Sequence, residues 1–382
     1  LNMFFVNNLF FIFYLFSHNN LKSSIERLML IVILIVIGFV ALFSATQNAG
    51  YDEFKKQIMW VLVSIPVMIV VILIDYEIFI KISPVLYGAS LIFLIGVLFT
   101  EPINGASSWF SIGKFTVQPA EFAKIAFVLF ITFVITKMQL KGKDETSRPL
   151  KLGLILLVAL VPILLIIKQP DYGTALAFIM SLIFMLFVSG IKKRYIITAI
   201  TTVAILVPVA YFFILPEHAK TRIDVFLNPD MDPRGAGYNI IQSKLAIGAG
   251  ELLGMGIFKG NQTQLGFLYP KTTDFIYSVI GEEMGFIVAA GVIILYVVLI
   301  TKAVYVAKTA KDDAGAYMAA GIAGIFFFHM LENIGMTMGL LPITGIPLPF
   351  VSYGGSSMVT NLIMIAILLN ISARRKRALF IS

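Results

Sequence analysis

The sequence predicts an all-α polytopic membrane protein with ten transmembrane helices, both termini in the cytoplasm and one long extracellular loop between spans seven and eight. Of its 382 residues, 59% are hydrophobic and 13% are charged, and the mean hydropathy is +0.94. Soluble domains carry roughly a quarter charged residues. The apolar residues form long unbroken blocks, whereas the strands of a membrane barrel would give alternating segments of about ten residues. The spans are therefore expected to be helices.

Ten blocks are apolar over a length that can cross a bilayer, for which a helix needs about 20 residues. One membrane domain over 27–375 is the simplest partition, followed by a basic cytoplasmic tail over 376–382. Residues 1–26 contain a short apolar stretch without a basic start or a cleavage site, Met3–Phe16, which we expect at the membrane interface. The expected spans are 28–46, 58–75, 82–100, 119–137, 151–168, 172–190, 194–215, 275–301, 315–338 and 351–373.

Basic residues predict the orientation of these spans, because loops rich in lysine and arginine stay in the cytoplasm. The loops and tails on the side of the two termini hold 18 of them, and the short loops of the opposite side hold four. The net charge of +8 is thus a topology signal, and nucleic acid is not needed to explain it. The four basic residues of the opposite side are Lys55, Lys56, Lys114 and Lys168.

The connection over 216–274 then lies outside the cell, and loops of this length are usually functional. It holds eight of the 29 glycines, nearly twice its share by length. Glycine suits positions where the backbone bends or where another chain segment approaches closely. Within the connection, residues 239–253 could form a short helix that lies at the membrane interface.

Ionisable residues at membrane depth are costly and are therefore functional candidates. Glu121 and Lys124 lie three apart on one face of span four, either as a local ion pair or with Lys124 facing a cavity that binds an anion. Asp171 follows Pro170 between two spans, where it can cap the next helix or contact a polar substrate.

Asp274 ends the long loop and opens span eight. It is either a helix-capping carboxylate or a functional acid, and better neutral caps precede it at Thr272 and Thr273. Glu282 and Glu283 follow about two turns later on the same helix. Two adjacent carboxylates at shallow membrane depth are expensive, so we expect one of them to pair with a basic residue of the outer loop.

Span nine and the segment after it form a third polar region. His329, Glu332 and Asn333 share one helical face, either as an interhelical hydrogen-bond cluster or as part of a catalytic set. Residues 339–355 carry no charge but many glycines and prolines. Such backbone is tolerated at membrane depth where it is buried in protein or lines a wet cavity. The segment, which includes Ser352, Gly354 and Gly355, is therefore expected to line a cavity.

Five motifs in order resemble the SEDS family of shape, elongation, division and sporulation proteins, which includes RodA, FtsW and SpoVE. The resemblance covers about 27–375, nearly the whole chain, and the segment 226–239 is more similar to RodA than to FtsW. The motifs are Asn-Gly-Ala-Ser-Ser-Trp-Phe at 104–110, Gln-Pro-Ala-Glu at 118–121, Gln-Pro-Asp-Tyr-Gly-Thr at 169–174, Thr-Thr-Asp-Phe-Ile at 272–276 with Gly-Glu-Glu at 281–283, and Pro-Leu-Pro-Phe-Val-Ser-Tyr-Gly-Gly-Ser-Ser at 347–357.

The resemblance implies a peptidoglycan glycosyltransferase in the bacterial cytoplasmic membrane. Such enzymes polymerise lipid II, a disaccharide-pentapeptide on undecaprenyl diphosphate, at the outer face of that membrane during elongation and shape maintenance. They work beside a class B penicillin-binding protein and other proteins of the elongation or division complex. The family's essential aspartate corresponds to Asp274, whereas Lys271 stands where an acidic residue is usual.

Glycan polymerisation requires a base for the attacking hydroxyl, cations for the diphosphate and an apolar path for the lipid. Asp274 is the expected base, since a carboxylate at an apolar boundary has a raised proton affinity. A divalent cation such as Mg²⁺ that bridges Asp274 and the diphosphate is an alternative role for the same carboxylate. Trp109 could stack on a sugar or anchor the membrane interface. Residues expected to contact the diphosphate or sugars are Lys124, Arg222, Lys244, Trp109, Glu121 and Asp171.

Two other functions share these features: a lipid II flippase, and a noncatalytic scaffold of the cell-wall synthesis complex. A flippase needs a polar route through both leaflets. Here the helix breakers and the nominated acid gather on the outer side, which favours the polymerase. A scaffold would leave Asp274 without a role. Residues expected to support the site or to line its cavity are Glu282, Glu283, His329, Glu332, Ser352, Gly354 and Gly355.

Overall fold

The computed structural model describes residues 18–374 except 103–104, 114, 214–216 and 233–234. The expectation for Met3–Phe16 and that for the tail over 376–382 lie outside the described residues. The helices are α2 (His18–Ala45), α3 (Asp52–Leu73), α4 (Tyr76–Gly96), α5 (Pro119–Met138), α6 (Pro149–Ile167), α7 (Tyr172–Val188), α8 (Lys193–Phe213), α9 (Glu217–Leu227), α10 (Ala236–Ala249), α11 (Asn261–Gln264), α12 (Ile276–Thr309), α13 (Asp313–Thr337) and α14 (Gly355–Ala373).

Eight of the described helices are long and apolar enough to cross a membrane, which confirms a mostly helical, multi-pass protein. Two further expected spans coincide with α7, an apolar helix of 17 residues, and with α8, a helix of 21 residues. The positions of all ten expected spans are therefore occupied by helices. That all ten cross the bilayer remains a prediction.

Local sequence explains where several of these helices begin. The Asp75 side chain accepts a hydrogen bond from the Glu77 amide at the start of α4, and Asp312 accepts one from the Gly315 amide at the start of α13. A carboxylate at this position satisfies an amide that has no partner within the helix. The helices α5 and α6 instead begin with proline, whose missing N–H costs nothing in the first turn.

The start of α2 and the end of α14 lie at the same end of the helical bundle. Arg27 of α2 donates a hydrogen bond through Nη2 to Ser372 Oγ of α14 at 2.9 Å. Near the same end, Arg374 Nε pairs with Asp75 Oδ2 at 3.1 Å. This arrangement agrees with two termini on one side of the membrane, and the assignment of that side to the cytoplasm remains a prediction from the basic loops.

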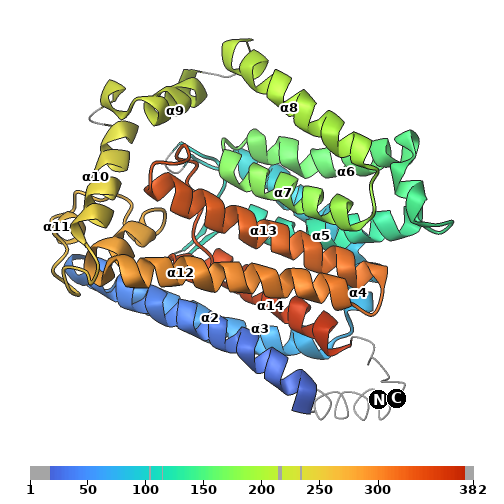
Figure 1. The fold of residues 1–382 in the computed structure, drawn as a ribbon, viewed down its shortest axis with the longest axis horizontal. Coiled ribbons are helices and arrows are strands. Elements are labelled where there is room, and N and C mark those ends of the chain that lie inside the picture. Colours follow the sequence, from blue (N-terminus) through green and yellow to red (C-terminus); the bar gives the residue numbers. More distant parts are fainter. Residues whose placement is uncertain (1–17, 103–104, 114, 214–216, 233–234, 375–382) are drawn as a thin grey trace.

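The core of the bundle is built around α13, which packs against α7 on one side and α12 on the other (Figure 1). Small residues allow the close approach of α13 and α7. A Cβ atom added to Gly324 would lie 2.8 Å from the backbone oxygen of Met180, so this contact requires glycine. Helices in membranes commonly associate through small residues in this way.

A short antiparallel hairpin between α4 and α5 departs from the expected all-α fold. Its strands are β1 (Phe110–Ile112) and β2 (Phe115–Val117), with Phe110 opposite Val117. The two strands flank a glycine with a positive φ of 62°, Gly113, which suits a tight turn. The hairpin directly follows Trp109 and so shapes the loop that carries this side chain.

The long connection over 216–274 is largely helical and contains α9, α10 and α11 (Figure 1). The expected helix over 239–253 is present as α10, which begins and ends a few residues earlier. The glycines of this connection mark close approaches, as expected. A Cβ atom on Gly250 would lie only 1.8 Å from the backbone oxygen of Gly281, so α12 and the end of α10 meet backbone to backbone.

The helix α12 is interrupted at Gly285, where φ is 78° and ψ is 179°, in contrast to the continuous span expected over 275–301. The connection over 216–274 satisfies the backbone groups that this break releases. Met255 N donates to Glu282 O at 2.9 Å, and Phe286 N donates to Glu251 O at 2.9 Å. A broken helix at membrane depth requires such partners, because unpaired backbone groups are costly in an apolar medium. The bonds at the break thus fix the connection over 216–274 to α12.

Candidate active site

Asp274 lies in the turn before α12, half-buried, and its backbone is held on one side by the C-terminal part of the chain. Three successive carbonyl groups, those of 272–274, each accept a hydrogen bond from a residue of α13 or of the loop over 338–354. These bonds join Tyr353 N to Thr272 O at 2.9 Å, Ser352 Oγ to Thr273 O at 2.6 Å, and Asn333 Nδ2 to Asp274 O at 3.0 Å.

The loop over 338–354 also approaches the carboxylate of Asp274. A Cβ atom on Gly345 would lie 3.4 Å from Asp274 Oδ2, and Gly345 has a φ of 73°. A residue with a side chain would be strained at this φ and would crowd the acid. Gln57 of α3 supports the far end of the loop, since its side chain donates to Ser352 O at 3.1 Å and accepts from Gly354 N at 3.1 Å.

The expected polar face of α13 is present, and its three residues contact the loop over 338–354. Each of them holds a different part of the segment 344–347. The bonds join Thr344 Oγ1 to Glu332 Oε1 at 2.7 Å, Asn333 Nδ2 to Ile346 O at 2.9 Å, and His329 Nδ1 to Pro347 O at 3.0 Å. The loop that approaches Asp274 is therefore attached to α13 by three hydrogen bonds, at residues 344, 346 and 347.

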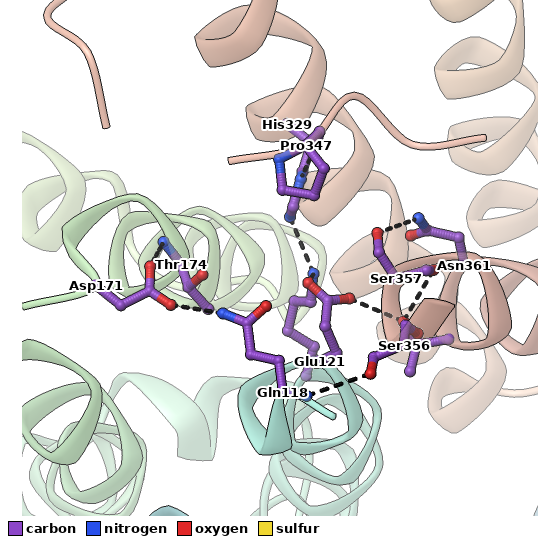
Figure 2. A network of polar contacts seen from close by, with 11 residues as sticks. Gln118, Glu121, Asp171, Thr174, His329, Pro347, Ser356, Ser357 and Asn361 are labelled. Carbon is purple, nitrogen blue, oxygen red and sulfur yellow. Dashed lines mark hydrogen bonds and ion pairs between the residues drawn. The ribbon is translucent and has the colours of Figure 1, made fainter. Parts of the chain in front are cut away.

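His329 also connects this loop to a buried ion pair (Figure 2). Lys124 Nζ lies 2.9 Å from Glu121 Oε1 and 3.0 Å from His329 Nε2. Lys124 can only donate, so Nε2 accepts and the imidazole carries its proton on Nδ1, which donates to the carbonyl of Pro347. Thr360 Oγ1 of α14 donates to the second oxygen of Glu121 at 2.9 Å. The local ion pair expected for these residues is present.

The side chain of Lys124 is fully buried, with 0% exposure, and that of Glu121 is 2% exposed. A buried pair of opposite charges with additional hydrogen bonds is satisfied, whereas either charge alone would be costly. In this arrangement the ammonium of Lys124 contacts protein groups of α5 and α13. The diphosphate contact expected for Lys124 requires this pair to open and so stays a prediction.

Asp171 caps α7 and is joined to α5. Its Oδ1 accepts from Thr174 N at 3.1 Å, and its Oδ2 accepts from Gln118 Nε2 at 2.8 Å (Figure 2). Burial raises the pKa of the Asp171 carboxyl group, against the opposing effect of the bond from Thr174. The capping role is observed, and a contact with substrate stays a prediction.

Glu282 and Glu283 hold the connection over 216–274, but not through the ion pair that we expected. Glu282 Oε1 accepts from Gln262 N at 2.7 Å, and its Oε2 accepts from Thr263 N at 3.0 Å. Glu283 Oε1 accepts from Gln264 Nε2 at 2.8 Å. The start of α11 presents unpaired amide hydrogens, which stabilise a carboxylate without a basic partner.

Lys271 links the segment around α11 to the turn that carries Asp274. Its Nζ donates to Thr263 O at 2.7 Å. Burial lowers the pKa of Lys271, and the nearby charges of Glu283 and Glu282 partly oppose this change. The basic residue that replaces the usual acid of the motif is thus accommodated by a backbone carbonyl.

The other residues expected at the site lie on several different elements. Trp109 is half-buried before β1, and Lys244 is exposed on α10, where its side chain runs beside Gly339. Arg222 lies on α9, and its side chain is outside the described part of the structure. Gly355 packs against Trp60, since a Cβ atom there would lie 2.4 Å from the indole ring.

Sequence reasoning missed two supporting side chains, Gln57 and Thr360. The signal for Gln57 was an amide at the edge of an apolar span, which is costly in lipid unless it is paired. Thr360 had no comparable signal, because threonine often bonds its own helix backbone. In the part of the chain that the structure describes, no group of three or more histidine or acidic side chains could hold a metal ion.

The fold and this arrangement of polar residues match a known family. The model of the FtsW/RodA/SpoVE family of cell cycle proteins matches residues 25–377. The peptidoglycan glycosyltransferase MrdB of Escherichia coli K12 is 36% identical over 93% of this chain and 95% of its own length. The peptidoglycan glycosyltransferase RodA of Treponema pallidum is 31% identical over 92% of this chain and 98% of its own length.

Solved structures agree with these relationships. A structure from a study of polymerization and crosslinking by a peptidoglycan synthase complex superposes with a TM-score of 0.79 at 26% identity, covering 92% of this chain and 98% of that chain. The rod shape determining protein RodA of Thermus thermophilus superposes with a TM-score of 0.68 at 24% identity, covering 92% and 97%, and supports the fold.

The protein is thus a multi-pass membrane protein of the cell-wall synthesis class. The chain belongs to the FtsW/RodA/SpoVE family. The family expected from the five motifs is confirmed, and so is the enzyme class, since the curated relatives are peptidoglycan glycosyltransferases.

Proposed function

We propose that this protein polymerises lipid II into glycan strands at the outer face of the bacterial cytoplasmic membrane, with Asp274 as the general base. The observation that carries the proposal is the position of Asp274 at the start of α12, where three successive backbone carbonyls are held by α13 and by the loop over 338–354. A base must be held within hydrogen-bond reach of the proton it removes, and a fixed backbone favours this.

In the proposed reaction, a sugar 4-hydroxyl oxygen attacks the anomeric carbon of a second, lipid-linked saccharide. The hydroxyl proton passes to the carboxylate of Asp274. The bond from the anomeric carbon to the diphosphate oxygen breaks, and undecaprenyl diphosphate leaves with the electron pair. The leaving group is already activated, so the reaction consumes no nucleotide.

The diphosphate requires positive charge on the same side as Asp274. Lys244 fits this role, because it is exposed on α10 beside Gly339, at the beginning of the loop that approaches the acid. We keep Arg222 as a second cation, since guanidinium binds diphosphate oxygens in a bidentate manner. Trp109 is the candidate for stacking on a sugar.

A divalent cation such as Mg²⁺ is the alternative partner of the Asp274 carboxylate. Among the described residues, no group of three or more acidic or histidine side chains could hold such an ion, so it would depend in part on the substrate's own oxygens. If lipid II polymerisation continues at an unchanged rate when a chelator removes divalent cations, Asp274 acts as the proton acceptor and not as a metal ligand.

The proposed setting is cell elongation, with both termini and the basic loops in the cytoplasm and 216–274 outside. A class B penicillin-binding protein, which crosslinks the new strands, is the proposed partner together with other proteins of the elongation or division complex. The likeness to a structure from a peptidoglycan synthase complex supports this association.

The direct test uses the purified full-length protein, alone and with its penicillin-binding partner, incubated with fluorescent lipid II. We expect a ladder of glycan strands on a gel. Movement of the same lipid between leaflets of reconstituted vesicles, without any strand formation, would instead support the flippase. If neither activity is detected with the partner present, the scaffold is favoured.

A further inference from the structure

We propose that Asn333 is a positioning residue that sets the place of Asp274 relative to the loop over 338–354. This inference rests on the proposed role of Asp274 as the base. It concerns a side chain of α13 that does not itself take part in proton transfer, and it identifies how the acid is held.

The amide group of Asn333 has two donor hydrogens, and the structure uses them on two different chain segments. Nδ2 donates to Asp274 O at 3.0 Å and to Ile346 O at 2.9 Å. The side chain is completely buried, with 0% exposure. One rigid amide therefore joins the turn before α12 to the loop over 338–354. Both segments are held by the same residue of α13.

The residue next to the second acceptor explains why this bridge affects the acid. Gly345 directly precedes Ile346, and a Cβ atom added to Gly345 would lie 3.4 Å from Asp274 Oδ2. When Asn333 holds Asp274 O and Ile346 O, it also sets the gap between the carboxylate and Gly345. A substrate hydroxyl must enter this region to reach the carboxylate.

Two other bonds join the same loop to the same turn, one and two residues before Asp274, and the bond from Tyr353 N to Thr272 O at 2.9 Å is the earlier of them. Ser352 Oγ donates to Thr273 O at 2.6 Å and accepts from Leu348 N at 2.8 Å, so it also joins the two segments, one residue earlier in the turn. Thr344 Oγ1 donates to Glu332 and holds only the loop. From α13, Asn333 contacts both segments, and it does so at the residue that carries the acid itself.

The test compares Asn333→Ala with the wild type in lipid II polymerisation, with kcat and KM measured separately. A displacement of a catalytic group by about 1 Å costs on the order of 100-fold in rate, so we expect kcat to fall ~10- to 100-fold. KM for lipid II should change by less than ~3-fold, because the expected substrate-binding residues are untouched. Ser352→Ala should lower kcat in the same direction by a smaller factor.

Asn370 provides a matched control at the other end of the bundle. It is also completely buried, and its Nδ2 donates to Val71 O at 2.7 Å and to Ile72 O at 3.1 Å. Asn370→Ala removes the same kind of bridge, far from Asp274, and should leave kcat within ~3-fold of the wild type in the folded fraction. Monodispersity and thermal unfolding in detergent report the folded fraction of each variant.

A wild-type kcat in folded Asn333→Ala would overturn the inference, and so would an equal loss in Asn333→Ala and Asn370→Ala. If Asn333→Ala does not fold, the outcome for Ser352→Ala decides alone. Failure of the proposed role of Asp274 as the base gives a different result from failure of this inference. In that case Asp274→Asn would polymerise lipid II normally, whatever the effect of Asn333→Ala.

Discussion

Replacing Asp274 with asparagine is expected to lower kcat for lipid II polymerisation by about 10³-fold, within the 10²–10⁴ range that a general base contributes. The amide has nearly the same shape as the carboxylate but cannot accept the proton of the sugar hydroxyl. The three backbone carbonyl bonds of 272–274 do not involve the side chain, so the fold should be retained. Strand formation from fluorescent lipid II, with the thermal unfolding midpoint measured in parallel, checks both parts.

Asp230 supplies the matched control for this substitution. It is exposed in the same connection over 216–274, and Asp230→Asn makes the same chemical change away from the turn that carries Asp274. Its rate should equal that of the wild type. An Asp274→Asn variant that keeps more than about a tenth of the wild-type rate would contradict its assignment as the base.

Removal of the buried ammonium of Lys124 is expected to have the largest effect on stability. Lys124→Met leaves the carboxylate of Glu121 buried, with a hydrogen bond from Thr360 but no opposite charge. Breaking one partner of a buried ion pair costs about 3–5 kcal/mol, whereas replacing both partners is often nearly neutral. The double variant Glu121→Gln with Lys124→Met should therefore recover most of the loss.

Denaturation of the purified protein in detergent, followed through tryptophan fluorescence, measures these differences. Lys143→Met is the control, because Lys143 forms an exposed ion pair with Asp313 and its side chain is 58% exposed. Exposed pairs contribute about 0–1 kcal/mol. Equal destabilisation by Lys124→Met alone and by the double variant would show that the loss does not arise from the uncompensated carboxylate.

Much of the fold follows from the sequence, because lipid imposes a simple rule on it. A block of about 20 apolar residues forms a helix, because lipid offers no hydrogen-bond partners and the backbone groups must bond to one another. The ten expected blocks all coincide with helices, and Asp171 caps α7 as its place after a proline indicated. The pairing of Glu121 with Lys124 could also be predicted, because residues three apart in a helix lie on one face.

The details that depend on tertiary contacts could not be obtained this way. The break of α12 at Gly285 is compensated by amides and carbonyls of 251–256, which have no pattern in the sequence. For the same reason we expected a basic partner for one of the two carboxylates, Glu282 or Glu283, whereas backbone amides of the connection over 216–274 bind Glu282. Backbone donors are identical at every residue, and only the folded chain shows which of them are available.

The bridge made by Asn333 shows the same limit at the candidate site. Its place on the polar face of α13 was evident, but its partners are two carbonyls, at residues 274 and 346, that lie far apart in the chain. The motif around Asp274 pointed to the acid through a family resemblance. The groups that hold the acid became identifiable only from the geometry.

The central claim is that Asp274 opens onto the outer face of the membrane, where the glycan is made. The chain has no cysteine, so Asp274→Cys introduces a unique thiol. A membrane-impermeant maleimide should label this variant in intact spheroplasts, and Lys143→Cys, at the basic end of the bundle, should react only after permeabilisation. Labelling of Asp274→Cys only after permeabilisation, with Lys143→Cys labelled from outside, would contradict the account.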